Sequence, residues 1–405
     1  MKSSLPSYLI ALTTAILMFH LLSIPAFSQV ESDERALINV DKGLSFSKDS
    51  LFKLNLRFRM QNRFGIRTES GNDLSIEQTD FRVRRLRLRL DGYVLSPKMQ
   101  YYIQLGFSKA DLDLESGGYA QPIRDAMIYY TFNKNFYVGF GQGKLPGNRE
   151  RVVSSGNLQF ADRSIANGVF TLDRDFGFFG YYTLPTKGRA EYQLKGAINT
   201  GEGRNPSPGD AGLSYTARFE YLPFGKFIDS GDYSEGDLEF EPVPKLAIGV
   251  SYNYNDEAVR TRGQLGSALY EARDLQVFIA DAMFKYMGWA VMGEYFQRVA
   301  SDPITQNEDG AIRTVWVGKG NNIHLSRMIS RKSELAVRYA SVRPDEVVKM
   351  QEQRLEETTL GYTRYINGHR IKMQGNVGYS WSNKQIELVQ TSNFWFATFQ
   401  IEFGI

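Results

Sequence analysis

The chain of 405 residues contains no cysteine, which excludes disulfide bonds, thiolate catalysis and cysteine-ligated zinc or iron. Histidine is almost as scarce. His20 lies in the N-terminal apolar stretch, and His324 and His369 lack the paired spacing of a metal site. The chain also has no G-x-S-x-G motif, which carries the serine nucleophile in many hydrolases. We therefore predict that the protein is not an enzyme and has no catalytic residues, no metal and no cofactor.

Three closely spaced glycines do not form a dinucleotide-binding motif, because the third glycine of that motif is missing. Gly139, Gly141 and Gly143 alternate along a candidate strand without the spacing that such a motif requires. Glycine within a strand leaves space for neighbouring side chains or for a loop that comes close. We interpret these three glycines as making room of that kind.

The chain has no strong excess of charge and no long apolar run beyond its first 28 residues. Its formal net charge of +3 gives no field that would attract nucleic acid. A membrane-spanning helix needs about 20 consecutive apolar residues, and no segment after residue 28 approaches that length. If the chain resides in a membrane, it must therefore cross that membrane with strands.

The first 28 residues have the pattern of a secretory signal peptide. Lys2 is followed by an apolar run over residues 9–22. Ala26 and Ser28 are the small residues of a cleavage site before Gln29. An uncleaved membrane anchor is the alternative, but a run of about fourteen apolar residues is short for a spanning helix. We therefore expect residues 1–28 to be removed.

Most of the remaining chain alternates between apolar and polar residues, which is the period of a β-strand. The alternation is sharpest over residues 81–95, where leucines face one side and arginines the other. These residues are Leu86, Leu88 and Leu90 against Arg85, Arg87 and Arg89. Phe81 and Val83 are out of phase with the leucines, which predicts a β-bulge near Arg84-Arg85.

Sixteen runs of this kind can be counted along the chain. They begin near residues 51, 77, 98, 121, 135, 172, 189, 211, 243, 272, 288, 312, 331, 354, 369 and 391. Most are longer than the roughly 9–11 residues with which a strand crosses a bilayer. The links between them alternate between tight turns and long loops, as in an up-and-down barrel of the outer-membrane type. The link over residues 223–242 is long where a short turn is expected, and the sequence offers no reason for it.

The end of the chain follows the same pattern, because residues 395–405 alternate between apolar and polar or small residues. A soluble secreted β-sandwich would show similar alternation. Long strands and a strongly basic polar side favour the membrane instead. We predict an all-β fold, a transmembrane antiparallel up-and-down β-barrel of about 16 strands with an infolded constriction loop. The barrel spans residues 51–405 and follows a short periplasmic N-terminal segment over residues 29–50.

A closed barrel of fifteen or more strands leaves a lumen too wide for strand side chains to fill. In the first run, Leu54, Leu56, Phe58 and Met60 alternate with polar residues as the leucines of the second run do. With the apolar side toward lipid, six arginines of these two runs point into the lumen. They are Arg57, Arg59, Arg63, Arg85, Arg87 and Arg89. Guanidinium groups stay charged and bind oxyanions with two hydrogen bonds, so a row of them attracts anions. In the alternative, these arginines pair with carboxylates and only hold the wall together. Candidate partners are Asp91, Asp125, Glu150 and Asp162.

The longest link, over residues 145–171, follows the fifth run. In large outer-membrane barrels the loop after the fifth strand commonly folds into the lumen and narrows it. Basic residues stand at the start of this link and within it, namely Lys144, Arg149, Arg151 and Arg163. They are mixed with Glu150 and Asp162, and such a mixture can bind an anion transiently and release it, as conduction requires. The alternative is an ordinary surface loop with solvated charges.

Several segments, spread over most of the chain, are similar to those of a known family. They are Arg84-Arg85-Leu86-Arg87-Leu88, residues 92–107, Gly141-Gln142-Gly143-Lys144-Leu145-Pro146, Glu150-Arg151, Ser154-Ser155, Phe160-Ala161-Asp162-Arg163-Ser164 and residues 361–373. Together they resemble the phosphate-selective porin O/P family. The resemblance implies a sixteen-stranded trimeric porin with basic residues along the third loop and the lumen wall.

From the residues and this resemblance we predict a porin of the Gram-negative outer membrane, through which small hydrophilic solutes diffuse passively. Its basic lumen favours anions such as phosphate or similar oxyanions. The expected partners are these small solutes, outer-membrane lipid and, by the resemblance, further copies of the chain in a homotrimer, but no nucleic acid. Two alternatives stay open. One is a general or sugar-type porin without phosphate selectivity, and the other is a plugged structural or adhesive barrel.

Overall fold

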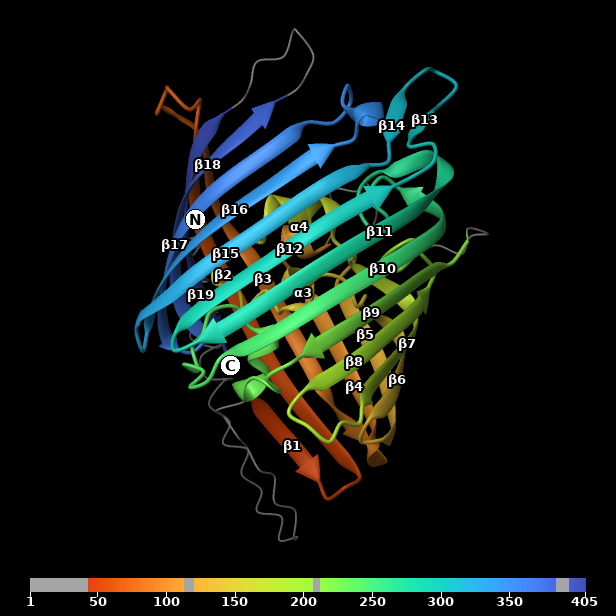
Figure 1. Ribbon diagram of the computed structural model, residues 1–405, viewed down its shortest axis with the longest axis vertical. Helices are drawn as coiled ribbons and strands as arrows, with labels where there is room; N and C mark the ends of the chain where they lie inside the picture. Colours follow the sequence, from red (N-terminus) through yellow and green to blue (C-terminus); the bar gives the residue numbers. More distant parts are fainter. Residues whose placement is uncertain (1–42, 113–119, 207–211, 384–392) are drawn as a thin grey trace, which may run out of the picture. The chain divides into compact units, whose positions relative to one another are not determined.

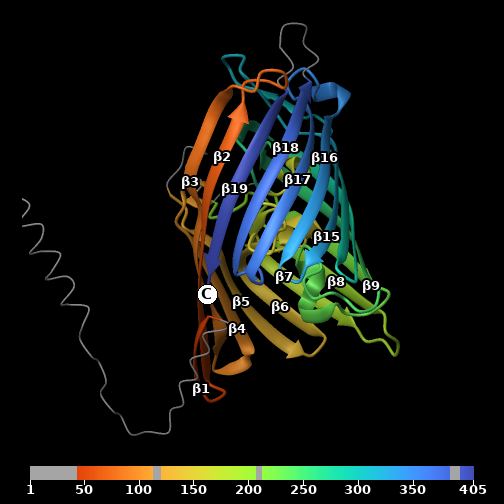
Figure 2. The same cartoon turned by 90° about the vertical axis from the view of Figure 1, so that its left-hand side faces the viewer.

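The computed structural model describes residues 43–112, 120–206, 212–383 and 393–405. Within these residues, sixteen antiparallel strands close into a barrel in which each strand pairs with the next and β19 pairs with β2 (Figures 1 and 2). The strands are β2 (Phe52–Thr68), β3 (Ile76–Val94), β4 (Ser96–Gly106), β5 (Ile123–Asn133), β6 (Phe136–Lys144), β7 (Arg174–Leu184), β8 (Glu191–Asn199), β9 (Ser214–Leu222), β10 (Lys245–Arg260), β11 (Ala268–Tyr286), β12 (Trp289–Val299), β15 (Gly318–Ser330), β16 (Ser333–Pro344), β17 (Arg354–Asn367), β18 (Ile371–Asn383) and β19 (Phe394–Gly404). The predicted barrel is confirmed.

A few shorter elements lie outside the barrel wall. β1 (Leu44–Lys48) pairs with the first residues of β2, and β13 (Ile304–Gln306) and β14 (Ile312–Thr314) form a small hairpin. The helices are α2 (Lys109–Leu112), α3 (Arg149–Val152), α4 (Ile165–Phe170), η2 (Ile228–Tyr233) and η3 (Glu346–Val348). None of the helices in the described part of the chain is long and apolar enough to cross a membrane. The predicted signal peptide (1–28), and the first fourteen residues (29–42) of the predicted periplasmic segment, lie outside the described residues.

The two rims of the barrel differ in the length of their links. Turns of one to six residues join β3 to β4, β5 to β6, β7 to β8, β11 to β12, β15 to β16 and β17 to β18 at one rim. We call it the short-turn rim and the other the long-loop rim. In barrels of the outer membrane, short turns face the periplasm and longer loops face outward. The long link between β9 and β10 lies at the short-turn rim. The structure therefore has a long link at the place where the sequence pattern predicts a short turn.

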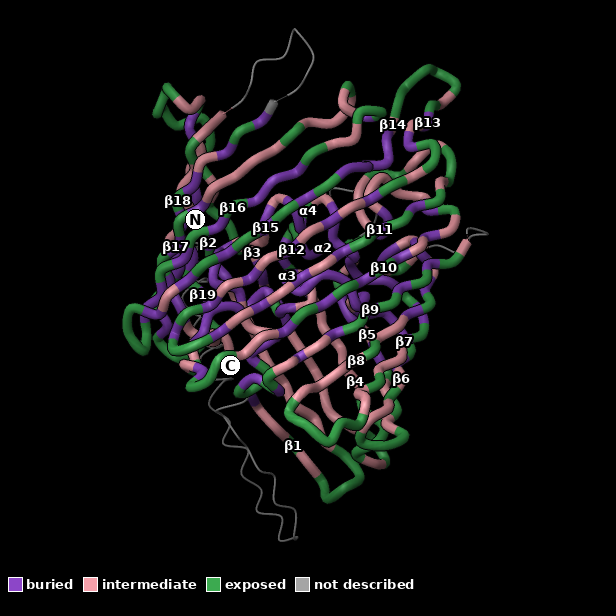
Figure 3. Tube along the Cα trace, viewed as in Figure 1, coloured by how far each residue is buried: buried purple, intermediate pink, exposed green. Residues whose placement is uncertain are grey.

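The strands turn polar residues inward and apolar residues outward. On β15, Asn322, His324 and Ser326 are buried, whereas Ile323 and Leu325, between them, are exposed. Buried and exposed residues alternate in this way along much of the wall (Figure 3). A soluble sandwich would bury the apolar side, because a large exposed apolar surface in water is unfavourable. The observed polarity fits a barrel with lipid outside and a polar lumen inside.

The predicted bulge in β3 is confirmed and explains why the leucine phase breaks there. Arg85 pairs with Gln61 of β2, and Val83 pairs with the next residue, Asn62, so that Arg84 has no partner in the ladder. One extra residue reverses the alternation. Val83 therefore faces outward, as the leucines that follow it do, while Arg84 and Arg85 both turn toward the lumen.

Candidate solute passage

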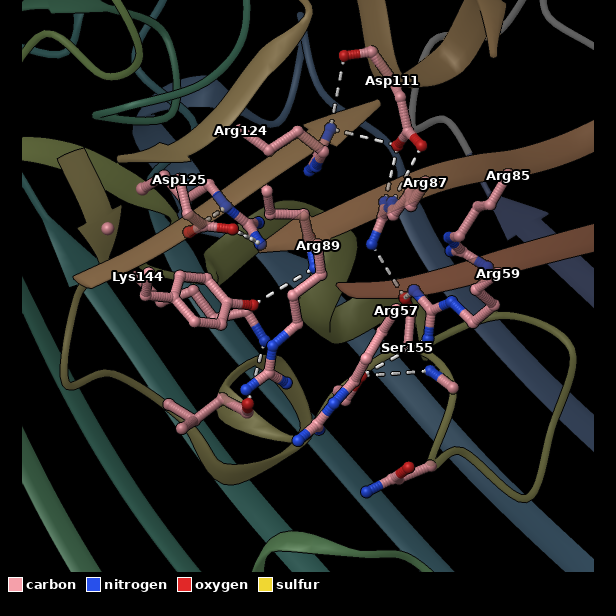
Figure 4. A pocket seen from close by; sticks show the side chains of 18 of the residues that line it. Arg57, Arg59, Arg85, Arg87, Arg89, Asp111, Arg124, Asp125, Lys144 and Ser155 are labelled. Atoms are coloured by element: carbon pink, nitrogen blue, oxygen red, sulfur yellow. Dashed lines mark hydrogen bonds and ion pairs between the residues drawn. The ribbon is translucent and has the colours of Figure 1, made fainter. Parts of the chain in front are cut away.

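Basic side chains line a cavity in the lumen, mostly from β2 to β7 and from the link over residues 145–173 (Figure 4). The cavity has a volume of about 770 Å³. Among the residues that the structure describes, thirteen basic side chains line it, namely Arg57, Arg59, Arg84, Arg85, Arg87, Arg89, Arg124, Lys144, Arg151, Arg163, Arg174, Arg204 and Arg370. Four described acidic side chains line it as well, namely Asp111, Asp125, Asp173 and Glu402. The excess of positive charge in the lining is therefore large.

Strand register brings the predicted arginines of β2 and β3 directly opposite one another. Arg57 is paired with Arg89, and Arg59 with Arg87. Like charges in directly opposed positions repel each other. Such an arrangement needs carboxylates close by, and the structure provides them.

Each of the six predicted wall arginines has a carboxylate oxygen within 4.0 Å, but the carboxylates are shared. Asp91 serves Arg57 and Arg89, Glu402 serves Arg59, Asp111 serves Arg87 and Arg124, and Asp162 serves Arg63, Arg84 and Arg85. Eight arginines thus share four carboxylates. The two sequence interpretations therefore apply together, because the arginines brace the wall and the wall still keeps a net positive charge.

Asp111, on α2, shows how strongly the arginines act on an acid in this lining. Burial by itself would raise the pKa of this carboxyl. The hydrogen bonds and charge of Arg87, together with the charge of Arg124, outweigh burial and hold its pKa well below the usual range. Asp111 therefore stays ionised at any ordinary pH and fixes both guanidinium groups.

The link over residues 145–173 folds into the lumen, and we call it the constriction loop. Its apolar side packs on the inner wall of the barrel, where Leu145, Phe170 and Leu172 form a buried cluster with side chains from several strands, such as Met127, Phe296 and Trp316. Hydrogen bonds also attach the loop to the wall. Lys372 donates to the carbonyls of residues 156 and 158 at 2.8 and 2.6 Å. The loop therefore fills one side of the lumen and leaves the passage along β2 to β7.

The constriction loop also touches the arginine wall. The hydroxyl of Ser155 accepts hydrogen bonds from Arg59 (2.7 Å) and Arg87 (3.0 Å). Asp162 forms an ion pair of 2.5 Å with Arg63. These contacts fix the position of the loop with respect to the wall, so that the cavity has a defined shape.

Eight of the ten sequence-predicted anion-path residues line the cavity, and two do not. Arg63 is held by Asp162 as described above. Arg149 is fully buried, donates to Asp281 at 2.9 Å and to the carbonyl of Asp232 at 2.8 Å, and lies 4.0 Å from Glu220. These two arginines anchor the constriction loop and do not face the passage.

The loop cations that do line the cavity are partly occupied. Lys144 donates to the carbonyl of Val152 at 2.9 Å, and Arg163 donates to the carbonyl of Glu150 at 2.7 Å. Arg151 is paired with Asp173. Each of them therefore holds the loop as well as contributing positive charge to the cavity.

A second segment enters the lumen from the short-turn rim. This segment, residues 223–242, is the long link that the sequence left unexplained. Its Tyr233 hydroxyl donates to Glu220, and its Ser234 carbonyl accepts a bond of 2.8 Å from Lys285. We call it the short-rim insertion, and it covers the constriction loop from the other end of the barrel.

Sequence reasoning missed five basic residues of the lining, namely Arg84, Arg124, Arg174, Arg204 and Arg370. The bulge near Arg84 was predicted, and following its effect on the alternation would have placed this arginine in the lumen. Arg124 and Arg174 stand at the first residues of their strands, where alternation is too short to assign a side. Arg204 lies in a link without any period, and Arg370 stands on the polar side of the run that begins near residue 369 but was not named as part of the anion path.

Sixteen antiparallel strands around a charged lumen, an apolar outer face and a loop folded inward define a porin of the outer membrane. The chain belongs to the family of phosphate-selective porins O and P, because the sequence profile described as "Phosphate-selective porin O and P" matches residues 52–395. The family resemblance of the sequence is thereby confirmed.

Individual relatives are distant. An uncharacterized protein of Aquifex aeolicus (strain VF5) is 22% identical over 365 residues, which cover 84% of this chain and 85% of that protein. Among solved structures, the outer membrane channel DcaP of Acinetobacter baumannii has a TM-score of 0.54 at 11% identity and covers 88% of this chain and 99% of its own. OprB of Pseudomonas putida has a TM-score of 0.54 at 11% identity, with coverages of 87% and 94%. At such low identity these structures show the shared fold only.

Proposed function

We propose that this porin lets small hydrophilic anions diffuse across the outer membrane and favours phosphate and similar oxyanions. The observation that carries the proposal is the cavity lining, with thirteen basic against four acidic side chains. A passage of one charge sign with low-dielectric walls concentrates ions of the opposite sign. The family's description, which names phosphate selectivity, supports the same solute class.

Conduction also requires that the anion leaves again, and the shared carboxylates favour this. Arg57 and Arg89 both contact Asp91, at 3.9 and 2.7 Å. An anion that enters must compete with this carboxylate for the guanidinium hydrogens. Binding is therefore weaker than at an unpaired arginine cluster, and several such positions in a row allow passage.

The assembly and export of the chain belong to the same proposal. A structure of OmpT from Vibrio cholerae in a trimer form, with a TM-score of 0.50 at 11% identity, supports a homotrimer in lipid for this chain. Residues 1–28 act as a signal peptide that is removed before the barrel forms. The barrel works as a passive channel and catalyses no reaction.

The test is the reversal potential of single channels in a planar bilayer under a KCl gradient. Anion preference shifts this potential toward the chloride equilibrium value, and added phosphate reduces the chloride current. Arg370→Gln removes a cavity arginine that forms no ion pair with a described residue, and it should lower the preference. Arg343→Gln, on the exposed end of β16, is the matched control and should change nothing.

Other results would assign another function. An open but unselective channel would identify a general porin in which the arginines only brace the wall. Absence of current from a folded barrel would identify a plugged structural or adhesive barrel. Phosphate without effect on an anion-selective current would remove the oxyanion preference and keep the anion channel.

A further inference from the structure

Four consecutive strands each turn a tyrosine into the lumen beside the arginine wall. They are Tyr102 of β4, Tyr129 of β5, Tyr137 of β6 and Tyr181 of β7. The ring centroids of Tyr137 and Tyr181 lie 4.5 Å apart in a stacked arrangement. Tyr129 lies 6.1 and 6.4 Å from these two rings. We call this group the tyrosine wall, and three of its members, Tyr102, Tyr129 and Tyr181, line the same cavity as the arginines.

The tyrosine wall is not part of an interfacial aromatic girdle. Girdle residues face lipid, and in this barrel the neighbouring Tyr130 and Tyr182 do so, in phase with the exposed Ile128 and Phe178 of the same strands. Tyr129 and Tyr181 point the opposite way, because successive residues of a strand alternate. The need for a membrane interface therefore does not explain them.

Packing holds the rings in place. Tyr102, Tyr129 and Tyr181 rest against a buried cluster that includes Met127. A Cβ atom on Gly139 would lie 2.8 Å from the ring of Tyr129, so the glycine leaves the space that this ring occupies. This fits the interpretation of Gly139 given above. The rings thus form a fixed surface rather than mobile side chains.

The hydroxyl groups do not account for the tyrosines either. The hydroxyl groups of Tyr129, Tyr137 and Tyr181 form no hydrogen bond with any of the described residues. The side chains therefore contribute their ring faces, and hydroxyl groups that remain available to water or solute.

The cationic and the aromatic surfaces are continuous. The guanidinium of Arg89 lies over the ring of Tyr102, with 4.6 Å to the centroid. Among the described residues, Arg89 and Arg57 share Asp91 as their one carboxylate within 4.0 Å, which leaves positive charge next to the first tyrosine. Along the lumen wall, a region for an anionic head thus passes directly into a region for a flat apolar body.

We propose that the cavity binds organic anions in which an oxyanion head is attached to an aromatic or other flat apolar body, and that it prefers them to inorganic oxyanions of the same charge. This inference rests on the proposed anion channel and narrows its substrate class. The head lies against Arg57 and Arg89, and the body lies against Tyr102, Tyr129 and Tyr181. Inorganic phosphate reaches only the first region and gains nothing from the rings.

The experiment compares two phosphate monoesters with the same head. Chloride current through single channels is measured while methyl phosphate or phenyl phosphate is added, and the half-blocking concentrations are compared. We expect phenyl phosphate to block at a concentration about tenfold lower, which is the order of effect expected from one or two aromatic contacts. Equal half-blocking concentrations for the two esters in the wild-type channel would overturn the inference without any variant.

A double variant tests whether the tyrosine wall is the cause. Tyr129→Leu with Tyr181→Leu keeps apolar bulk but removes the rings, so the two esters should then block at similar concentrations, while methyl phosphate blocks as before. The matched control, Tyr130→Leu with Tyr182→Leu, changes the adjacent lipid-facing rings and should keep the tenfold difference. If the lumen variant also keeps that difference, the tyrosines are not the recognition surface.

The proposed anion channel is tested separately by the reversal potential under a KCl gradient, with no organic phosphate present. An anion-selective channel that treats both esters alike refutes only this inference. An unselective channel refutes the anion preference itself, whatever the two esters do.

Discussion

The backbone N–H of Gln159 donates a hydrogen bond of 2.9 Å to the side-chain carboxyl group of Glu235. Gln159 belongs to the constriction loop, which enters from the long-loop rim, and Glu235 belongs to the short-rim insertion. A second bond of 3.0 Å runs from the N–H of Glu235 to the carbonyl of Asn157. Two insertions from opposite rims therefore meet inside the lumen and support each other. The width of the passage depends on both of them.

Removing the short-rim insertion should widen the passage. Replacing residues 223–244 with the two-residue turn Asn-Gly would join β9 to β10 directly, as a hairpin allows. The constriction loop would lose its contacts with Asp232 and Glu235, so we expect a higher single-channel conductance with larger fluctuations. Deleting residues 307–310, the tip of the β13–β14 hairpin, shortens a different link and is the control. Equal conductance in both variants would show that the insertion plays no part in the constriction.

The stability of this assembly should depend on pH through Glu235. Burial, with the charge of Glu150 nearby, raises the pKa of Glu235 to about 8. The charges of Arg163 and Arg338 act in the opposite direction but do not compensate. Burial also leaves one carboxylate oxygen, Oε1, with no hydrogen-bond partner among the described residues, which fits a carboxyl that holds a proton at pH 7.

The sign follows from proton binding in the two states. In the unfolded chain the pKa of a glutamate is about 4.3, so between that value and about 8 the folded protein keeps a proton that the unfolded chain has lost. The free energy of unfolding should therefore decrease as pH rises through this window and level off above it. Urea unfolding at pH 5, 7 and 9 measures this, and Glu235→Gln should have a smaller decrease. Equal pH dependence of the two proteins would contradict the assignment.

The barrel wall could be predicted from the sequence because successive side chains of a strand point to opposite faces, with a period of two residues. Once Leu86, Leu88 and Leu90 were assigned to lipid, the lumen side of Arg85, Arg87 and Arg89 followed without a structure. The same reasoning gave the bulge at Arg84, where the phase changes. Alternation fixes only the direction of a side chain, so it did not show that Arg57 and Arg89 share one carboxylate.

The positions of the two insertions could not be predicted in this way, because their residues do not alternate between apolar and polar. Arg149 was predicted to lie on the anion path as a loop cation, yet its partner Asp281 is 132 residues away in the chain. Nothing in the local sequence distinguishes it from Arg151, which does line the cavity. The short-rim insertion was noticed only by its length, since the partners of Tyr233 and Glu235 lie on other strands or in the constriction loop.

Arg149 should matter for stability more than for selectivity. Replacing it with alanine leaves Asp281 and Glu220 buried with less compensation, although Arg218 still contacts both. Removing one member of a buried charge cluster costs on the order of 3 kcal/mol. We expect Arg149→Ala to lower the free energy of unfolding in urea by about this amount. Arg343→Ala, at a half-exposed position, should change it by less than about 0.5 kcal/mol, and a similar small change for Arg149→Ala would show that the loop does not depend on this anchor.

The preference for anions should weaken with salt, because thirteen described cations around one cavity produce a field that acts on a passing ion beyond the few in direct contact with it. The Debye length is about 10 Å at 0.1 M and about 3 Å at 1 M ionic strength. At 1 M the field of an arginine hardly reaches the middle of the passage, whereas at 0.1 M the fields of several arginines overlap there. Reversal potentials under threefold KCl gradients, centred at 0.1 M and at 1 M, should give a clearly lower anion-to-cation permeability ratio at the higher concentration. A ratio that stays constant would mean that the preference comes from direct contacts with guanidinium groups alone and not from their combined field, since contact pairs within a largely buried site are screened much less.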